Sequence, residues 1–200
     1  MSKTQTIIIF LLSFLSFSCK SEGTGGMGKY KVDESLKKEV ERNIGDMNGF
    51  PVGSLELKIY ENDVLTFDNF GDDEKGELLF MTSYQGDTMC IIGFAGFTVA
   101  LGFYLDLYGD NYELTYMVKS DAEIYKYNED DERASYKLSV PCSYTSCILT
   151  SKPTFTKGDV VSGVVELKSN DFWDLANGRK NKYRVELKAY FQASEVDFGL

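Results

Sequence analysis

The chain has 200 residues, of which 31 are acidic and 21 are basic, and its formal net charge at pH 7 is −10. This charge argues against binding to nucleic acid, or to acidic lipid through a basic patch. The sequence contains no histidine, which excludes a Ser-His-Asp triad, a Cys-His pair and the common histidine-containing zinc sites. We therefore expect a non-catalytic protein without a metal or another cofactor.

The first 18 residues have the pattern of a secretory signal peptide. Lys3 precedes an apolar run over residues 7–17, which as a helix would be about 17 Å long and too short to cross a hydrocarbon core of roughly 30 Å. Ser16-Phe17-Ser18 is the small-bulky-small pattern that a signal peptidase recognises, so cleavage is predicted just before Cys19. The alternative is a buried N-terminal helix, which the lack of a polar face disfavours.

Residues 15–22 read LSFSCKSE, where the apolar run ends at a cysteine and polar residues follow. This stretch resembles the lipobox of bacterial, Bacteroidetes-type lipoproteins, although Ser16 stands where that motif usually carries leucine. The resemblance implies that Cys19 is acylated and becomes the first mature residue, and that the protein is exported to the outer membrane, on its periplasmic or cell-surface side. Two or more acyl chains would anchor it stably in the membrane. A plain secreted protein is the alternative.

Residues 19–29 are rich in glycine and small polar residues, which predicts a flexible tether behind the anchor. The remaining residues, 30–200, are enough for a substantial core and show no second linker or repeat, so they are predicted to form a single β-rich domain.

One amphipathic helix is predicted at the start of this domain. Asp33 can cap it, Leu36, Val40 and Ile44 recur on one stripe, and Gly45 is a natural stop. We expect the apolar stripe to pack on the sheet of the same chain, with a partner-binding helix as the alternative.

Beyond this helix the hydrophobic period changes to two, which is typical of strands with one buried face. The most apolar stretch, residues 89–105, is interpreted as a buried strand with a bulge or bend near its glycines at 93–96. The strongest hairpin prediction joins residues 101–108 to residues 112–119 through a turn at 109–111. Further strands are predicted at 55–60, 64–67, 77–84, 123–127, 135–140, 147–150, 160–168 and 182–192.

About ten short strands with alternating polarity predict an antiparallel β-sandwich, with a β-barrel as the alternative. Cys142 and Cys147 bracket four residues, and a hairpin loop there could bring them close enough for a disulfide. Cys90 lies in an apolar run and is expected to be a buried free thiol.

The segment NDFWDLANGRK contains the chain's only tryptophan. Phe172, Trp173, Arg179 and Lys180 are the candidate binding residues, because an aromatic group beside cations can anchor a protein or stack on a sugar. The alternative is that one of the two aromatic rings plugs an end of the sandwich. Acidic clusters at residues 72–74, at positions 106, 110 and 113, and at residues 129–132 could bind calcium. None has the ligand spacing of an EF-hand loop, and solvated hairpin tips explain each cluster without an ion.

Three functions remain open at this point. The first is a non-catalytic cell-envelope lipoprotein that binds a protein or glycan partner through loops at one end of the sandwich. The second is a barrel that carries an apolar ligand in a cavity lined by Phe94, Phe97, Phe103 and Leu105. The third is a hydrolase that uses carboxylates alone, which requires two converging acids.

Overall fold

The structure is a computed structural model, and it describes residues 25–47, 50–71, 75–96, 99–156, 158–175 and 178–194. Within these ranges the fold is mainly β, as predicted, with a 3-10 turn η1 (Glu34–Leu36) and a short helix α2 (Lys37–Arg42). The strands are β1 (Gly26–Lys29), β2 (Lys31–Val32), β3 (Gly45–Met47), β4 (Phe50–Glu61), β5 (Val64–Asp68), β6 (Gly76–Gln85), β7 (Thr88–Ala95), β8 (Ala100–Tyr108), β9 (Asn111–Lys119), β10 (Tyr125–Lys126), β11 (Lys137–Val140), β12 (Cys142–Leu149), β13 (Val161–Ser169), β14 (Phe172–Asp174) and β15 (Asn181–Ala193).

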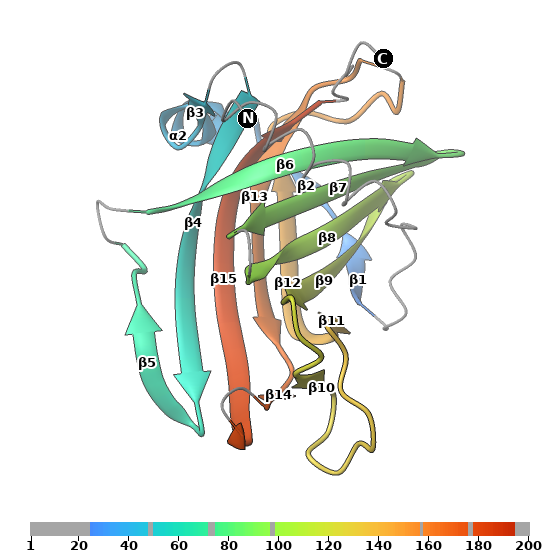
Figure 1. The fold of residues 1–200 in the computed structure, drawn as a ribbon. Coiled ribbons are helices and arrows are strands. Elements are labelled where there is room, and N and C mark those ends of the chain that lie inside the picture. Colours follow the sequence, from blue (N-terminus) through green and yellow to red (C-terminus); the bar gives the residue numbers. More distant parts are fainter. Residues whose placement is uncertain are drawn as a thin grey trace, which may run out of the picture.

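These strands form one strongly bent sheet whose main path runs β1-β9-β8-β7-β6-β4-β15-β13-β12-β2. Every pairing along this path is antiparallel except that of β12 with β2. In Figure 1, β4, β15, β13 and β12 lie side by side, and β6 to β9 cross them at a steep angle. Sheets that cross in this way pack their inner faces together to form one core, so the predicted antiparallel sandwich or barrel is confirmed.

The N-terminal segment nearly closes the sheet into a barrel. Strand β1 pairs with β9, and β2 pairs with β12, with only Tyr30 between the two short strands. The Tyr30 hydroxyl donates a hydrogen bond to the backbone oxygen of Gly109, 2.8 Å away. Residues 26–32 therefore join the two ends of the sheet.

The structure corrects the boundary of the predicted tether, because residues 26–29 belong to strand β1. A Cβ atom on Gly26 would lie 2.3 Å from the Thr145 side chain, and one on Gly28 would lie 3.0 Å from the ring of Tyr112. The glycines thus let the backbone approach β12 and β9 closely. The composition that indicated flexibility serves tight packing instead.

The core lies between the two crossing parts of the sheet. The strand predicted at 182–192 corresponds to β15, whose alternate residues Val185, Leu187, Ala189 and Phe191 belong to the core. Phe103 is fully buried there, and the centroid of the Phe80 ring lies 6.4 Å from that of Phe103 and 6.1 Å from that of Phe191. Full burial of such a side chain stabilises the fold by roughly 1.5–3 kcal/mol.

The interpretation of residues 89–105 as one bent strand is wrong. They form two antiparallel strands, β7 and β8, that pair with each other from Thr88 and Tyr108 to Ala95 and Leu101. The chain reverses after Gly96, whose φ of +89° lies in the left-handed region that glycine adopts readily. Uniform apolarity concealed this reversal, because both strands are buried on both faces.

A second apolar cluster lies on the outer face of β6 to β9 and contains Ile92, Phe94, Tyr104 and Met117. Phe94 therefore faces away from Phe103, which points into the main core beside Leu105. Phe97, the fourth residue of the proposed cavity lining, lies outside the described residues. The three described members do not converge on one cavity.

The predicted helix is present but short. Asp33 accepts a hydrogen bond from the backbone of Ser35 and so caps η1, and α2 follows. Val40 and Ile44 pack against Val164 and Tyr190 on the outside of β13 and β15. Packing on the chain's own sheet is thus confirmed. No helix in the described part of the chain is long and apolar enough to cross a membrane.

Candidate functional site

Phe172 is a core residue. It is 4% exposed, and its ring centroid lies 5.8 Å from those of Tyr116 and Tyr183 and 6.3 Å from that of Tyr125. The plug considered from the sequence is therefore this ring, which closes the end of the core beneath β14. A ligand outside the barrel cannot reach it without opening this aromatic cluster.

Trp173 is half-buried on β14, between Lys126 of β10 and Lys182 of β15. Arg179 and Lys180 are exposed beyond the end of β14. The Lys180 ammonium lies 3.7 Å from a Glu129 carboxylate oxygen, so this contact joins the loop after β14 to the loop after β10.

The β4–β5 turn lies at the same end of the fold. The Lys182 ammonium lies 2.7 Å from a carboxylate oxygen of Asp63, and the side chain of Asn62 accepts a hydrogen bond from the backbone of Lys182 at 3.0 Å. The structure thus brings together residues from three separate segments around Trp173. We call this surface, formed by residues 62–63, 126–129, 173 and 179–182, the Trp173 end.

The Cys142–Cys147 disulfide predicted from spacing is not formed, and both thiols are free. The reason is that β12 continues as one extended strand through both residues, with a single irregularity between Cys142 and Tyr144, where a hairpin was expected. Five residues of extended strand span about 16 Å, more than twice the Cα separation of roughly 7 Å that a disulfide tolerates. Cys90 is buried and forms no disulfide, as expected, and its side chain is hydrogen-bonded with Asp106.

The buried thiols predict a loss of stability in alkali. Burial raises the pKa of Cys147 to about 12 and that of Cys142 to about 11, against roughly 8.5 for a free thiol. Above about pH 8.5 the unfolded chain releases protons that the folded chain keeps, so the free energy of unfolding falls as the pH rises toward 12. Urea titrations between pH 7 and 11 measure this fall. A Cys147→Val variant is expected to show a shallower pH dependence, and an unchanged slope would contradict the assignment.

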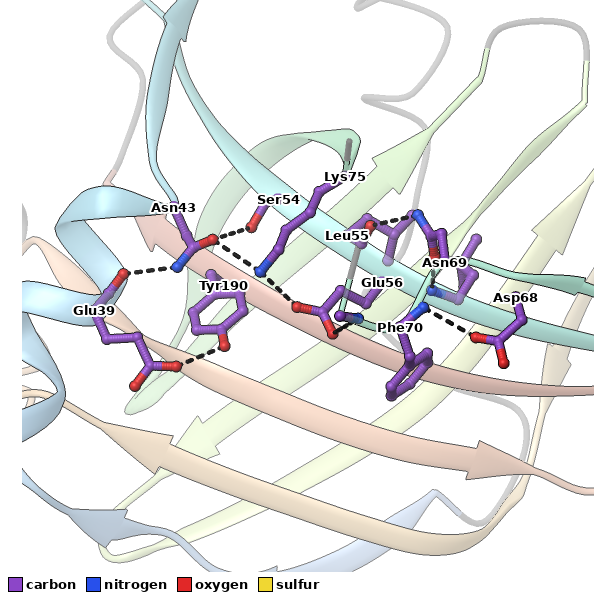
Figure 2. Close-up of polar contacts among 12 residues, drawn as sticks. Glu39, Asn43, Ser54, Leu55, Glu56, Asp68, Asn69, Phe70, Lys75 and Tyr190 are labelled. Atoms are coloured by element: carbon purple, nitrogen blue, oxygen red, sulfur yellow. Dashed lines mark hydrogen bonds and ion pairs between the residues drawn. The ribbon is translucent and has the colours of Figure 1, made fainter. Parts of the chain in front are cut away.

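A polar network that the sequence did not indicate joins α2 to β4 and β15 (Figure 2). The Tyr190 hydroxyl donates to a Glu39 carboxylate oxygen at 2.7 Å, and the side-chain amide of Asn43 donates to the backbone oxygen of Glu39 at 2.8 Å. The Lys75 ammonium donates to the side-chain oxygen of Asn43 at 3.0 Å and lies 2.5 Å from a carboxylate oxygen of Glu56.

Glu56 is buried, with only 7% of its side chain exposed. Its second carboxylate oxygen accepts a hydrogen bond from the backbone of Gly71 at 3.3 Å. The Lys75 ammonium also lies over the Tyr190 ring, 4.7 Å from its centroid. Burial raises the pKa of the Tyr190 phenol, so it remains a proton donor at neutral pH. The network's groups are thus engaged with one another, and it fastens the helix to the sheet.

A cleft of about 510 Å³ lies on the other side of α2. Its walls come from the helix, from the connection after β12 and from the ends of β13 and β15, and most of its lining is polar. The lining residues are Glu34, Lys37, Val40, Glu41, Thr150, Ser151, Val160, Ser162 and Gln192.

The acidic clusters differ in their surroundings. Residues 72–74 lie outside the described residues. Asp110 is paired with Lys152 at 2.8 Å, and this hydrogen bond lowers the pKa of the Asp110 carboxyl. Asp106 and Glu113 face each other across β8 and β9, and burial, reinforced by Glu113, raises the pKa of Asp106. Within the described ranges no three potential metal ligands of the His, Cys, Asp or Glu type gather in one place.

Two features of these sites carried no usable signal in the sequence. Glu56 alternates with the core residues Leu55 and Leu57, a pattern typical of the wet face of a strand, but Lys75 and the loop at Gly71 cover it. Tyr190 and Glu39 are 151 residues apart in the chain, a separation over which local patterns predict nothing.

No family model matches the chain, and no curated protein or solved structure is significantly similar to it.

Proposed function

We propose that the protein is an exported lipoprotein, anchored in the outer membrane through acylated Cys19, that binds a protein or glycan partner through the Trp173 end without transforming it. The observation that carries this proposal is the convergence of three separate segments around a half-buried tryptophan. The anchor is supported by residues 15–22 of the sequence.

The chemistry of the Trp173 end suits recognition. Tryptophan offers a large, flat contact area at low cost in conformational entropy, and tryptophan and arginine are enriched where binding energy concentrates in interfaces. Arg179 is exposed in the same loop as Lys180, and its guanidinium can bind a carboxylate with two hydrogen bonds. Tyr127, which is 40% exposed after β10, adds further aromatic surface.

Binding is tested by substitutions at this surface. Trp173→Ala and Arg179→Ala should each weaken binding by roughly 30-fold or more, as expected for residues at the centre of an interface. Pull-downs from the source cell envelope and glycan arrays measure the effect with the folded mature domain as bait. Tyr144→Ala, which alters a residue 47% exposed on β12, is the control. If both substitutions leave every protein and glycan signal unchanged, this surface is not the binding site.

The anchor has its own test. Mass spectrometry of the mature N-terminus should show Cys19 as the first residue, carrying a diacylglyceryl group and an acylated amine. Cys19→Ser should release the protein from the membrane fraction. An unmodified Cys19 in the native protein would contradict the anchor and would leave the binding proposal untouched.

A further inference from the structure

β5 is an edge strand with an apolar surface. All five of its residues are exposed, including Val64 at 63%, Leu65 at 47% and Phe67 at 47%. Among the described strands it pairs with β4 alone, and in Figure 1 it stands on the outer side of β4, away from β6 to β9. Its outer edge therefore offers backbone groups and apolar side chains together.

This edge lacks the usual protection against pairing with another chain. Natural edge strands are commonly blunted by lysine, by proline or by inward-pointing charges, but β5 reads VLTFD. Its one charged residue, Asp68, is paired with Lys58 at 3.4 Å. β5 has one irregularity, a bulge near Thr66, and the Thr66 hydroxyl donates to the backbone oxygen of Ile59 at 3.1 Å. This contact fixes β5 on β4 and does not cover the outer edge of β5.

Asn69 holds β5 apart from β6, the other strand on the same edge of β4. Its side-chain oxygen accepts from the backbone of Leu57 at 2.5 Å, and its side-chain amide donates to the backbone oxygen of Leu55 at 3.4 Å. One side chain thus takes the place of a strand between β5 and β6, as Figure 2 shows at Leu55 and Asn69. The edge of β5 is held in position before any partner arrives, which lowers the entropic cost of binding.

We infer that β5 is a docking edge for an extended segment of another protein, which would add to the sheet as one further strand. In this mode backbone hydrogen bonds provide affinity and alternate side chains provide specificity. The segment should carry apolar residues at alternate positions to cover Val64 and Phe67, which pair with Glu61 and Ile59 and so share one face, whereas Leu65 pairs with Tyr60 on the other face. It should be neutral or basic, because the chain carries a formal charge of −10 and the cations beside β5, Lys58 and Lys182, are already paired with acids.

A second copy of the chain fits this edge less well. Two copies would bring together two strongly acidic molecules, and three half-exposed side chains are far from the roughly 800 Å² per partner that a stable interface needs. A short strand from a less acidic protein avoids the repulsion. This inference concerns a surface other than the Trp173 end, and either can fail without the other.

The test uses a fluorescein-labelled probe peptide, acetyl-KTVTVTVK-amide, and the folded mature protein. Fluorescence anisotropy should show saturable binding, with a dissociation constant below about 1 mM. The double variant Leu65→Lys/Phe67→Lys should weaken binding of the probe by at least about tenfold. A probe with N-methylated threonines should bind the unsubstituted protein no more tightly than the unmodified probe binds this variant. Tyr144→Lys/Val160→Lys is the matched control, because it makes the same charge change at positions 47% and 49% exposed on other segments.

Hydrogen exchange provides a second readout, since the probe should protect the backbone of β5 in the unsubstituted protein. Absence of binding at millimolar probe, equal binding of the N-methylated probe, or equal weakening by the control variant would each overturn the inference. Sedimentation that shows a dimer lost in Leu65→Lys/Phe67→Lys would overturn the assigned occupant in favour of a second copy.

Discussion

Replacement of Lys75 by methionine should lower the free energy of unfolding by about 3–5 kcal/mol, because it leaves a buried carboxylate without its partner. Glu56 has 7% of its side chain exposed, and its salt bridge with Lys75 is 2.5 Å long. The substitution also removes the donor to Asn43 and so loosens the attachment of α2. Urea unfolding followed by circular dichroism measures the loss.

Two further variants distinguish the effect of a buried, unpaired Glu56 carboxylate from the effect of losing a salt bridge. Lys58→Met breaks the salt bridge between Lys58 and Asp68, whose side chains are 29% and 37% exposed, respectively. It should lower the free energy of unfolding by no more than about 1 kcal/mol. Glu56→Gln/Lys75→Met removes both charges and should recover much of the stability lost in Lys75→Met. Equal losses for Lys75→Met and Lys58→Met would show that Glu56 is not sequestered from water.

Phe103→Ala is expected to have an effect of similar size, about 3–5 kcal/mol, because it opens a cavity in the core. Phe103 is fully buried between β7 and β9. Its ring also fills the space above Gly93, where an added Cβ would lie 2.7 Å from the ring. Gly93→Ala alone should therefore overpack the core and cost about 1–3 kcal/mol.

These two positions should be coupled. In Gly93→Ala/Phe103→Leu the smaller side chain makes room for the new methyl group, so the double variant should be more stable than the sum of its single substitutions implies. Thermal and urea unfolding of Gly93→Ala, Phe103→Leu and the double variant measures the coupling. Tyr136→Ala, at a residue 55% exposed, is the control and should change stability by less than about 0.5 kcal/mol. Strict additivity would contradict the contact between Gly93 and Phe103.

Sequence patterns predicted the strands that have one wet face. The strands predicted at 55–60 and 182–192 correspond to parts of β4 and β15, where Leu57 and Leu187 face the core and burial on one side imposes a period of two. The same rule failed for residues 89–105, where an apolar cluster on each face removes the alternation. It also misplaced Glu56, because residues distant in the sequence cover a face that the local pattern marks as wet.

The candidate binding residues show the same division. Composition singled out NDFWDLANGRK, and the structure leaves Trp173 half-buried and Arg179 and Lys180 exposed but turns Phe172 into the core. Adjacent residues of a strand point to opposite faces, and a strand of three residues such as β14 is too short for a period of two to be recognised in the sequence. The network around Tyr190 depends on contacts between the two ends of the chain, which spacing within either end cannot reveal.

The early start of β1 limits how far the barrel can stand from a lipid bilayer. If Cys19 carries the acyl chains, only seven peptide units separate it from Gly26, the first paired residue, and a fully extended backbone of that length spans about 25 Å. A leash that lasted to residue 30 would reach nearly 40 Å. Such an anchor would keep the barrel within one domain diameter of the headgroups, and a binding partner would then have to lie at the membrane surface or extend a segment down to it.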